Sequence, residues 1–346
     1  MKKIQTSVIA LALAAAGVQT ISAQSQVANN RRERILQVLD QSRPNEYVPA
    51  AFFLHFENKL GRKAVDDHRA FYKATNMDFV KVFYEISVPQ IEINSGKDWE
   101  KVPVYGEDFF APQVAVIEDL ARDYGNEAFV LPTVYSPLAL AGQTLGRGKD
   151  LKKLAEQNPV AFGKAIKNLA LSIENYLRAA RKHGADGFYV SSQGGDGNSL
   201  STKIWKEQVR QWDKYVSEVA NEIGEINILH ICDYGTPFKN AEALYAFTDY
   251  PASIINVPLN FSDGSTLNLK EAQQRFGRPI FGGLERLGVI AKGSIEEAKA
   301  AVDKVLENAP NNFILGADCT VPGETDWEKL RAVIDYTHTW RQTHKK

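Results

Sequence analysis

The stretch Asn227-Ile-Leu-His-Ile-Cys-Asp-Tyr-Gly235 joins a short apolar run to a histidine and a cysteine. Its length and apolar character predict a buried β-strand. Residues two apart in a strand point to the same side, so this strand would direct His230 and Cys232 into one cavity. The only other cysteine, Cys319, follows a second apolar run in Gly316-Ala-Asp-Cys319. The sequence therefore predicts two strands whose ends carry one imidazole and two thiols.

The rest of the chain repeats the pattern of a short apolar run followed by a segment of helical periodicity. The predicted strands cover residues 47–56, 79–83, 128–134, 188–190, 226–231, 253–257, 279–281 and 312–315. The predicted helices cover residues 31–42, 65–75, 114–124, 158–183, 201–223, 240–247, 269–276, 295–308 and 327–340. Gly184 suits the C-terminal cap of the longest helix, and Thr325 is a candidate N-cap of the last.

This alternation predicts an α/β fold, a single distorted (β/α)8 barrel of the TIM type. Residues 87–112, after the second strand, contain Gly, Pro and Trp and predict an irregular excursion, and a loop is expected from Pro137 through Gly148. A doubly wound open sheet is the alternative. No Gly-x-Gly-x-x-Gly motif follows any predicted strand, which disfavours a dinucleotide-binding version of that sheet.

The first residues predict export. Lys2 and Lys3 precede an apolar run over residues 8–18, and Ile21-Ser-Ala23 forms a cleavage site of small residues. This is the pattern of a secretory signal peptide over residues 1–23, and its apolar run is too short to span a bilayer. A membrane-tethered chain is the alternative. We expect a periplasmic or secreted protein without stable membrane insertion, in which residues 24–346 form the barrel domain.

The composition points to a small-molecule partner. Hydrophobic residues make up 44% and charged residues 24% of the chain, which is ordinary for a globular protein. The net charge of −1 gives no electrostatic basis for binding nucleic acid or an anionic membrane.

Barrel enzymes place their chemistry at the carboxyl ends of the strands. The polar residues predicted at those ends are His55, Glu85, Tyr135, Gln193, His230, Cys232, Asn256, Glu285 and Cys319. Among them Glu85 is a candidate catalytic base, whereas His55, Gln193, Asn256 and Glu285 are candidates for binding substrate. Asp233 and Asp318 flank the cysteines and are candidates for orienting the two thiols.

His230, Cys232 and Cys319 together suit a tetrahedral zinc ion with one open position, as in catalytic zinc sites. Two alternatives remain for the cysteines: a Cys232–Cys319 disulfide, which an oxidising compartment would favour, and two inert buried thiols. The alternative for His230 is a core histidine that is hydrogen-bonded to backbone. The joint occurrence of three zinc-binding residues at one barrel mouth favours the metal.

Four stretches resemble the uroporphyrinogen decarboxylase superfamily, which includes cobamide-dependent methyltransferases that pass a methyl group to a thiol. They are Asp78-Phe-Val-Lys-Val82, Gly184-Ala-Asp-Gly-Phe188, Phe281-Gly-Gly-Leu-Glu-Arg-Leu-Gly-Val-Ile290 and Ile314-Leu-Gly-Ala-Asp-Cys-Thr-Val-Pro322. The resemblance covers nearly all of the chain after residue 23 and implies a distorted eight-stranded barrel.

At the site residues the chain is more similar to the methyltransferase branch. Where the decarboxylases carry an arginine, an aspartate and a late histidine, this chain has His55, Glu85 and Ala317. The methyltransferases carry a His-x-Cys pair and a distant cysteine as zinc ligands, which match His230, Cys232 and Cys319. The resemblance thus implies zinc, a thiol acceptor and a methylated cobamide as donor, usually carried by a partner corrinoid protein.

Three hypotheses follow. The first is an exported zinc enzyme that transfers a methyl group from a methylcobamide to a thiol. The second is a decarboxylase of tetrapyrroles, and the third is a non-catalytic protein that binds a corrinoid or porphyrin. Export conflicts with a cytoplasmic corrinoid partner, so the first hypothesis requires a scavenged or imported substrate, or another zinc-assisted reaction on the same fold.

Overall fold

The computed structural model describes residues 30–40, 42, 46–83, 87–233 and 236–344. Its centre is a parallel sheet in which each strand pairs with the next along the chain. The strands are β1 (Phe79–Val82), β2 (Phe129–Tyr135), β3 (Gly187–Ser192), β4 (Ile226–Ile231), β5 (Ile254–Asn256), β6 (Ile280–Leu284) and β7 (Phe313–Ala317). Nearly all of their residues are buried, as expected for a parallel sheet covered on both faces.

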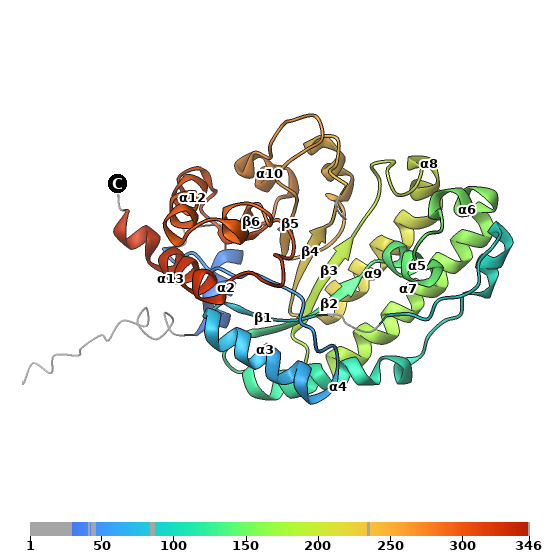
Figure 1. Cartoon of the computed structure of the whole chain (residues 1–346), viewed down its shortest axis with the longest axis horizontal. Coiled ribbons are helices and arrows are strands. Elements are labelled where there is room, and N and C mark those ends of the chain that lie inside the picture. The colour runs from blue at the N-terminus through green and yellow to red at the C-terminus, as the bar shows by residue number, and fades with distance from the viewer. Residues whose placement is uncertain (1–29, 41, 43–45, 84–86, 234–235, 345–346) are drawn as a thin grey trace, which may run out of the picture.

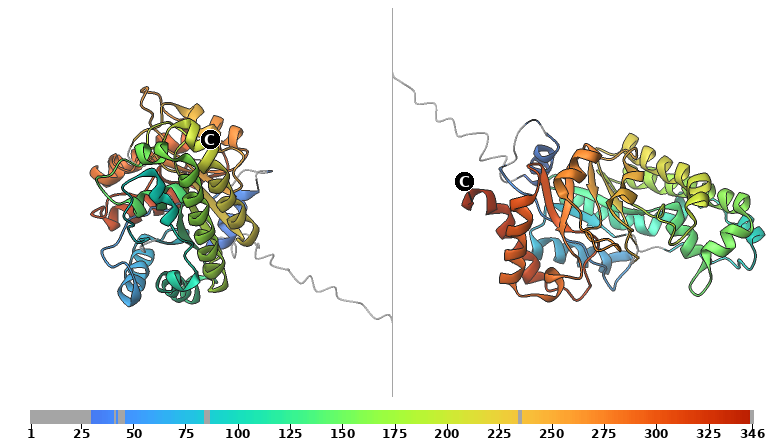
Figure 2. Two further views of the ribbon diagram at one scale, coloured as in Figure 1. Left: turned by 90° about the vertical axis from the view of Figure 1, so that its right-hand side faces the viewer. Right: turned by 90° about the horizontal axis from the view of Figure 1, so that it is seen from above.

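Helices surround the curled sheet (Figure 1). They are α2 (Arg31–Leu39), α3 (Gly61–Thr75), α4 (Glu107–Tyr124), α5 (Pro137–Leu145), α6 (Leu151–Gln157), α7 (Pro159–Lys182), α8 (Thr202–Ile204), α9 (Arg210–Ile223), α10 (Leu269–Phe276), α11 (Val289–Lys292), α12 (Ile295–Asn308) and α13 (Trp327–Thr343). Figure 2 shows α13, in red, at the end of the molecule opposite to the green segment with α5 and α6. The architecture is that of a TIM-type barrel, which confirms the predicted fold class.

The segment predicted as the first strand, residues 47–56, is extended but forms only one bridge, between Ala50 and Leu315. The Ala51 N–H donates to the Leu315 carbonyl at 3.0 Å, and the Asp78 N–H, just before β1, donates to the Ala50 carbonyl at 3.1 Å. The segment therefore lies between β7 and β1 and occupies the eighth position of the barrel. The prediction of a regular strand was wrong for this segment. One reason is that Pro49 has no N–H to donate to the hydrogen-bond ladder of the sheet.

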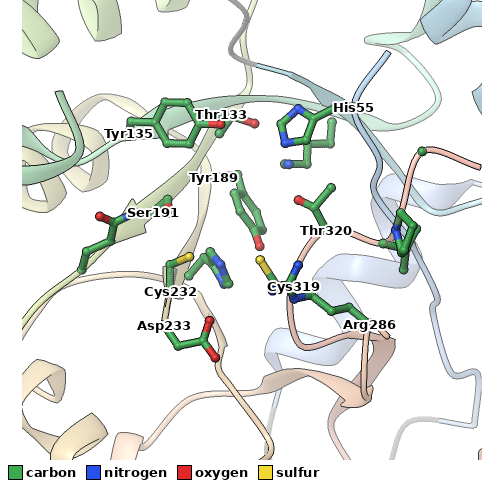
Figure 3. A pocket seen from close by; sticks show the side chains of 16 residues that line it. His55, Thr133, Tyr135, Tyr189, Ser191, Cys232, Asp233, Arg286, Cys319 and Thr320 are labelled. Carbon is green, nitrogen blue, oxygen red and sulfur yellow. The ribbon is translucent and has the colours of Figure 1, made fainter. Parts of the chain in front are cut away.

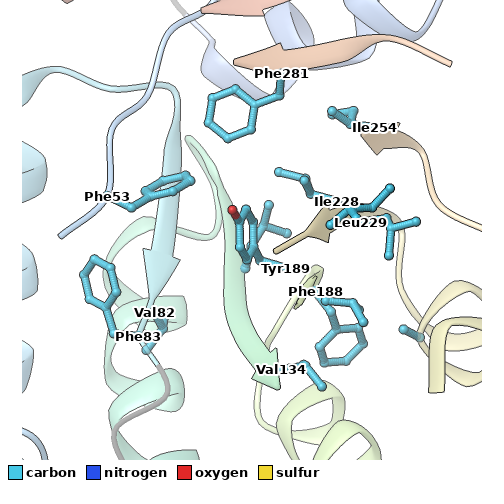
Figure 4. Packing of buried hydrophobic residues seen from close by; sticks show 14 of the residues in the cluster. Phe53, Val82, Phe83, Val134, Phe188, Tyr189, Ile228, Leu229, Ile254 and Phe281 are labelled. Carbon is cyan, nitrogen blue, oxygen red and sulfur yellow. The ribbon is translucent and has the colours of Figure 1, made fainter. Parts of the chain in front are cut away.

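This closing segment also fills the barrel interior. The Phe53 ring packs edge-on against the rings of Tyr189 and Phe281, with centroids 5.6 Å apart in each pair (Figure 4). Aromatic pairs in this geometry add about 0.5–1.5 kcal/mol to the burial of their area.

Several predicted boundaries need correction. Residues 137–145 form helix α5 instead of a loop, because Ser136 accepts a hydrogen bond from the Ala139 N–H and Pro137 suits the first turn. The excursion ends earlier than predicted, since α4 already begins at Glu107. Asp326, rather than Thr325, caps α13 by accepting from the Glu328 N–H.

Two predicted helices are less regular than expected. The helix expected at 201–223 contains a π-helical turn at Trp205–Val209, and the one expected at 240–247 is a 3-10 helix at Ala241–Phe247. A further 3-10 turn, Gly96–Lys101, lies in the excursion and packs beside α6 and α7.

The predicted signal peptide, residues 1–23, lies outside the described residues and stays a prediction. Within the described part of the chain, no helix combines the length and the apolar character needed to cross a membrane.

Asp78 anchors the closing segment. Its carboxylate is fully buried and accepts hydrogen bonds from the Ala50 N–H at 2.8 Å and from the Tyr47 hydroxyl at 3.1 Å. The His338 Nε2 on α13 lies 2.8 Å from the same carboxylate. One buried charge thus joins the closing segment, β1 and the last helix.

We expect Asp78→Asn to lower the free energy of unfolding by about 2–4 kcal/mol, because the amide cannot replace a charged acceptor of several buried hydrogen bonds. Urea denaturation measures this. The control is Asp119→Asn on α4, where a partly exposed carboxylate pairs with Arg122 and a change below about 0.5 kcal/mol is expected. Equal effects of the two substitutions would contradict the role given to Asp78.

Candidate metal centre

His230, Cys232 and Cys319 meet at the carboxyl ends of β4 and β7. Their ligand atoms, one imidazole nitrogen and two sulfurs, all lie within 4.8 Å of one another. His230 is 3% exposed and Cys232 9%, and both cysteines are free thiols. Ligands of a tetrahedral zinc ion are about 3.5–3.8 Å apart when the metal–ligand bonds are 2.0–2.3 Å long. The three side chains therefore need only small movements to share one zinc ion.

The strand register places the first two candidate ligands, His230 and Cys232. Ser191 of β3 pairs with His230, and the Cys232 N–H extends this pairing by donating to the Ser192 carbonyl at 2.8 Å. His230 and Cys232, two residues apart, both line the cavity that begins at the end of the sheet. The alternation predicted from the sequence is thus what directs them to one side.

Cys319 is placed by the loop that follows β7. The Asp318 N–H donates to the Leu284 carbonyl at 2.9 Å, and the Asp318 carboxylate accepts from the Arg286 N–H at 2.8 Å. These two hydrogen bonds fasten the loop after β7 to the loop after β6. Burial raises the pKa of Asp318 to about 6.

The imidazole of His230 is buried without a hydrogen-bond partner on either nitrogen among the described residues. A buried polar group left unpaired costs about 1–3 kcal/mol, which a bound metal ion would relieve. The backbone-bonded core histidine that the sequence left open is therefore not observed.

The two thiols influence each other. The neighbouring Cys232 thiol and the His230 ring hold the pKa of the Cys319 thiol well below its ordinary value, against the opposing effect of burial. The thiolate is the form of cysteine that binds metal ions.

A cavity of about 470 Å³ opens beside the cluster (Figure 3). The three cluster residues line it, and so do His55, Tyr135 and Gln193, which the sequence placed at strand ends. Asp233 also lines it, whereas Asp318 does not. This size is typical of sites for small ligands.

Two predicted substrate contacts lie elsewhere. Asn256 is fully buried behind the cavity wall, where its side chain bonds to other strands. Glu285 is exposed and does not line the cavity, but the next residue, Arg286, does. Both residues lie in a turn after β6, which the Gly288 N–H closes by donating to the Glu285 carbonyl at 3.0 Å, so strand alternation does not decide which side chain lines the cavity. Glu85 lies outside the described residues, so its role stays a prediction.

Gly194, which follows β3, and Gly283 of β6 do not line the cavity. Gly194 has a φ of +89°, and a Cβ added there would lie 2.6 Å from the Trp205 ring. A Cβ on Gly283, where φ is +102°, would lie 2.6 Å from Val305. Both positions require glycine for backbone conformation and packing.

Lys81 was not among the residues predicted at strand ends. This lysine is 3% exposed in the middle of β1 and lines the cavity, with its Nζ 4.5 Å from the ring centroid of Tyr189 and 4.7 Å from those of Phe53 and Phe83. Aromatic faces at such distances attract a cationic side chain. The signal was present in the sequence, since a lysine between valines in a buried strand is unusual.

A buried acid close to the site predicts a pH dependence of stability. Asp213 of α9 is 1% exposed, and burial raises its pKa to about 7, an effect that Ser192, Tyr250 and Arg210 only partly offset. The native state thus keeps a proton that the unfolded chain releases near pH 4. The free energy of unfolding must then fall as the pH rises from about 4 to 7.

We expect Asp213→Asn to flatten this fall and to exceed the wild-type free energy of unfolding by about 1–4 kcal/mol at pH 8. Urea denaturation at pH 4.5, 6 and 8 measures the difference. Asp66→Asn is the control, because Arg69 lowers the pKa of that exposed carboxyl and the fall above pH 5 should persist. Parallel curves for Asp213→Asn and wild type would contradict the prediction.

A family model described as "Uroporphyrinogen decarboxylase (URO-D)" matches residues 72–340. No curated protein matches the chain. A solved structure described as a methyltransferase from Methanosarcina mazei is similar at 15% identity and a TM-score of 0.72, over 90% of this chain and 99% of that one.

Weaker similarity extends to two other solved structures. A putative vitamin-B12 independent methionine synthase from Listeria monocytogenes shares 13% identity, with a TM-score of 0.48 over 84% of this chain and 98% of that one. A B12-independent methionine synthase from Shewanella sp. W3-18-1 shares 14% identity, with a TM-score of 0.46 over 66% of this chain and 67% of that one. At such identities, structural similarity speaks for the fold alone.

Proposed function

The chain belongs to the uroporphyrinogen decarboxylase family, and from this we propose that it is a zinc enzyme that transfers a methyl group to a thiol. The observation that carries the proposal is the cluster formed by the buried His230 and Cys232 with the half-buried Cys319. These residues also resemble the zinc ligands of the methyltransferase branch, which supports methyl transfer to a thiol.

The residues present fit a zinc ion. One imidazole nitrogen and two thiolate sulfurs are donors that zinc prefers, and the unpaired imidazole would supply a buried ligand. His230, Cys232 and Cys319 would hold the ion, and the adjoining cavity leaves room for a fourth ligand. Zinc at this position would keep a bound thiol deprotonated at neutral pH, which makes its sulfur a nucleophile.

The chain's own groups prepare the acceptor for reaction. The cavity wall excludes bulk water on the side of Tyr135, Tyr189 and Thr133, which are mostly buried. The acceptor thiolate would form a bond to the methyl carbon as the bond between that carbon and the donor breaks, and the electron pair of the broken bond would stay with the donor. A methylated cobamide, free or on a partner corrinoid protein, is the donor that we propose. An exported protein would draw both substrates from scavenged compounds.

Decarboxylation of a tetrapyrrole is the less favoured activity. Among the described residues, the cationic side chains on the cavity wall are Lys81 and Arg286, few for a substrate with eight carboxylates. His55 stands in the cavity where that branch carries an arginine, and Ala317 replaces its late histidine. These departures favour the smaller, thiol-bearing substrate.

The metal is tested by analysis of protein purified without chelator. We expect about one zinc per chain and at least a tenfold loss of zinc affinity in each of His230→Gln, Cys232→Ser and Cys319→Ser, because each removes a ligand. His183→Gln, at the exposed end of α7, is the matched control and should retain zinc. Less than half an equivalent of zinc, unchanged by Cys232→Ser, would contradict the proposal. A thiol titration of the unfolded, unreduced protein separates two thiols from a disulfide.

The reaction is tested with methylcobalamin as donor and 2-mercaptoethanol as acceptor. We expect the zinc-loaded protein to demethylate the cobalamin, seen in its visible spectrum, and the rate to fall at least 100-fold in Cys319→Ser. Formation of less-carboxylated products from uroporphyrinogen, with no demethylation, would indicate the decarboxylase instead. Tight tetrapyrrole binding that survives loss of all three ligands, without turnover, would indicate a binding protein.

A further inference from the structure

The His230 imidazole lies against the ring of Tyr189. The two ring centroids are 5.3 Å apart and the planes are inclined by 27°, which is a stacked arrangement. Tyr189 of β3 pairs with Ile228 of β4, two residues before His230. Such diagonal neighbours on adjacent strands are within reach of aromatic side chains. The phenol ring of Tyr189 therefore packs against one face of the His230 imidazole, on the inner side of the sheet.

The phenol is itself fixed at its far end. The Tyr189 hydroxyl donates to the Asn256 Oδ1 at 2.7 Å. The Asn256 Nδ2 donates in turn to the carbonyls of Phe281 and Ala317, at 2.7 and 3.1 Å. Tyr189 and Asn256 are both buried. Two further strands thereby determine where the Tyr189 ring lies.

His230 lacks the usual means of fixing a metal-binding histidine. Such histidines ordinarily donate their second ring N–H to a carboxylate, a carbonyl or a water molecule, which sets the ring plane. Neither nitrogen of His230 has a hydrogen-bond partner among the described residues. Packing must then set the ring plane, and Tyr189 supplies the stacked surface.

We propose that Tyr189, held by Asn256, is the positioning residue that orients His230 toward the metal ion. This inference rests on the proposed zinc site and adds a role for Asn256. The sequence made Asn256 a substrate contact, but its amide acts through Tyr189 and His230.

Cobalt(II) is the probe, because its visible absorption bands and its sulfur-to-metal charge-transfer bands report ligand geometry without turnover. The variants are Tyr189→Leu, which removes the ring, and Tyr189→Phe, which keeps the ring but loses the bond to Asn256. Tyr176→Phe is the matched control, since it removes another buried tyrosine hydroxyl, 3.4 Å from the Thr133 carbonyl. Each is titrated with cobalt against a competing chelator.

We expect Tyr189→Leu to weaken cobalt binding 10- to 100-fold and to shift the visible bands, as loss of an orienting neighbour does at other metal sites. Tyr189→Phe should weaken binding only a few-fold with broadened bands, and Tyr176→Phe should match wild type. Wild-type affinity and spectrum in Tyr189→Leu would overturn the inference and leave the metal site intact.

Two other outcomes are decisive. If Tyr189→Leu does not fold, the test rests on Tyr189→Phe. A cobalt spectrum and affinity identical to wild type in Tyr189→Phe would overturn the role of Asn256 in holding the ring. If wild type binds no cobalt, or binds it without charge-transfer bands, the proposed function itself fails, and this inference fails with it.

Discussion

The buried amide of Asn256 holds several strand ends in place at the level of the ligand cluster. It lies at the end of β5, opposite His230 in the strand register, and bonds to Tyr189 on β3, Phe281 on β6 and Ala317 on β7. Each unmade hydrogen bond at such a buried amide would cost about 1–3 kcal/mol, so the strands keep this arrangement. The position of the cluster depends on it, since Ala317 leads directly to Cys319.

The parallel sheet explains why residues distant in sequence meet. All strands run in one direction, so their carboxyl ends gather at one mouth, and Cys319 reaches His230 and Cys232 although almost ninety residues separate the two cysteines. The two loops after β6 and β7 are fastened through Asp318, which fixes the position of Cys319, the third candidate ligand. The same mouth contains the cavity, so the cluster borders the space that a substrate would enter.

Local pattern predicted much of the fold. The strand at 226–231 and the helices at 269–276 and 295–308 match their predicted bounds. The closing segment does not form a regular strand, and its single bridge depends on Asp78 and Leu315, which no local pattern reveals. Ser136 and Pro137 are typical of a helix N-terminus and could have predicted α5, but the glycines that follow favoured a loop.

The site was predictable where spacing alone decides it. His230 and Cys232 share a side because they are two residues apart, whereas Asn256 points inward yet lies too deep to meet substrate. How deeply a side chain is buried depends on how the neighbouring strands pack over it, and this packing cannot be read from the sequence. Lys81 shows the converse, since a residue in the middle of a strand can still reach the cavity.

X-ray absorption at the zinc edge of the purified protein tests the central claim most directly. The account predicts a shell of two sulfurs at about 2.3 Å and at least one nitrogen at about 2.0 Å. It also predicts that Cys319→Ser reduces the sulfur contribution by half. A shell made only of nitrogen and oxygen, with Cys232 and Cys319 joined in a disulfide, would contradict it.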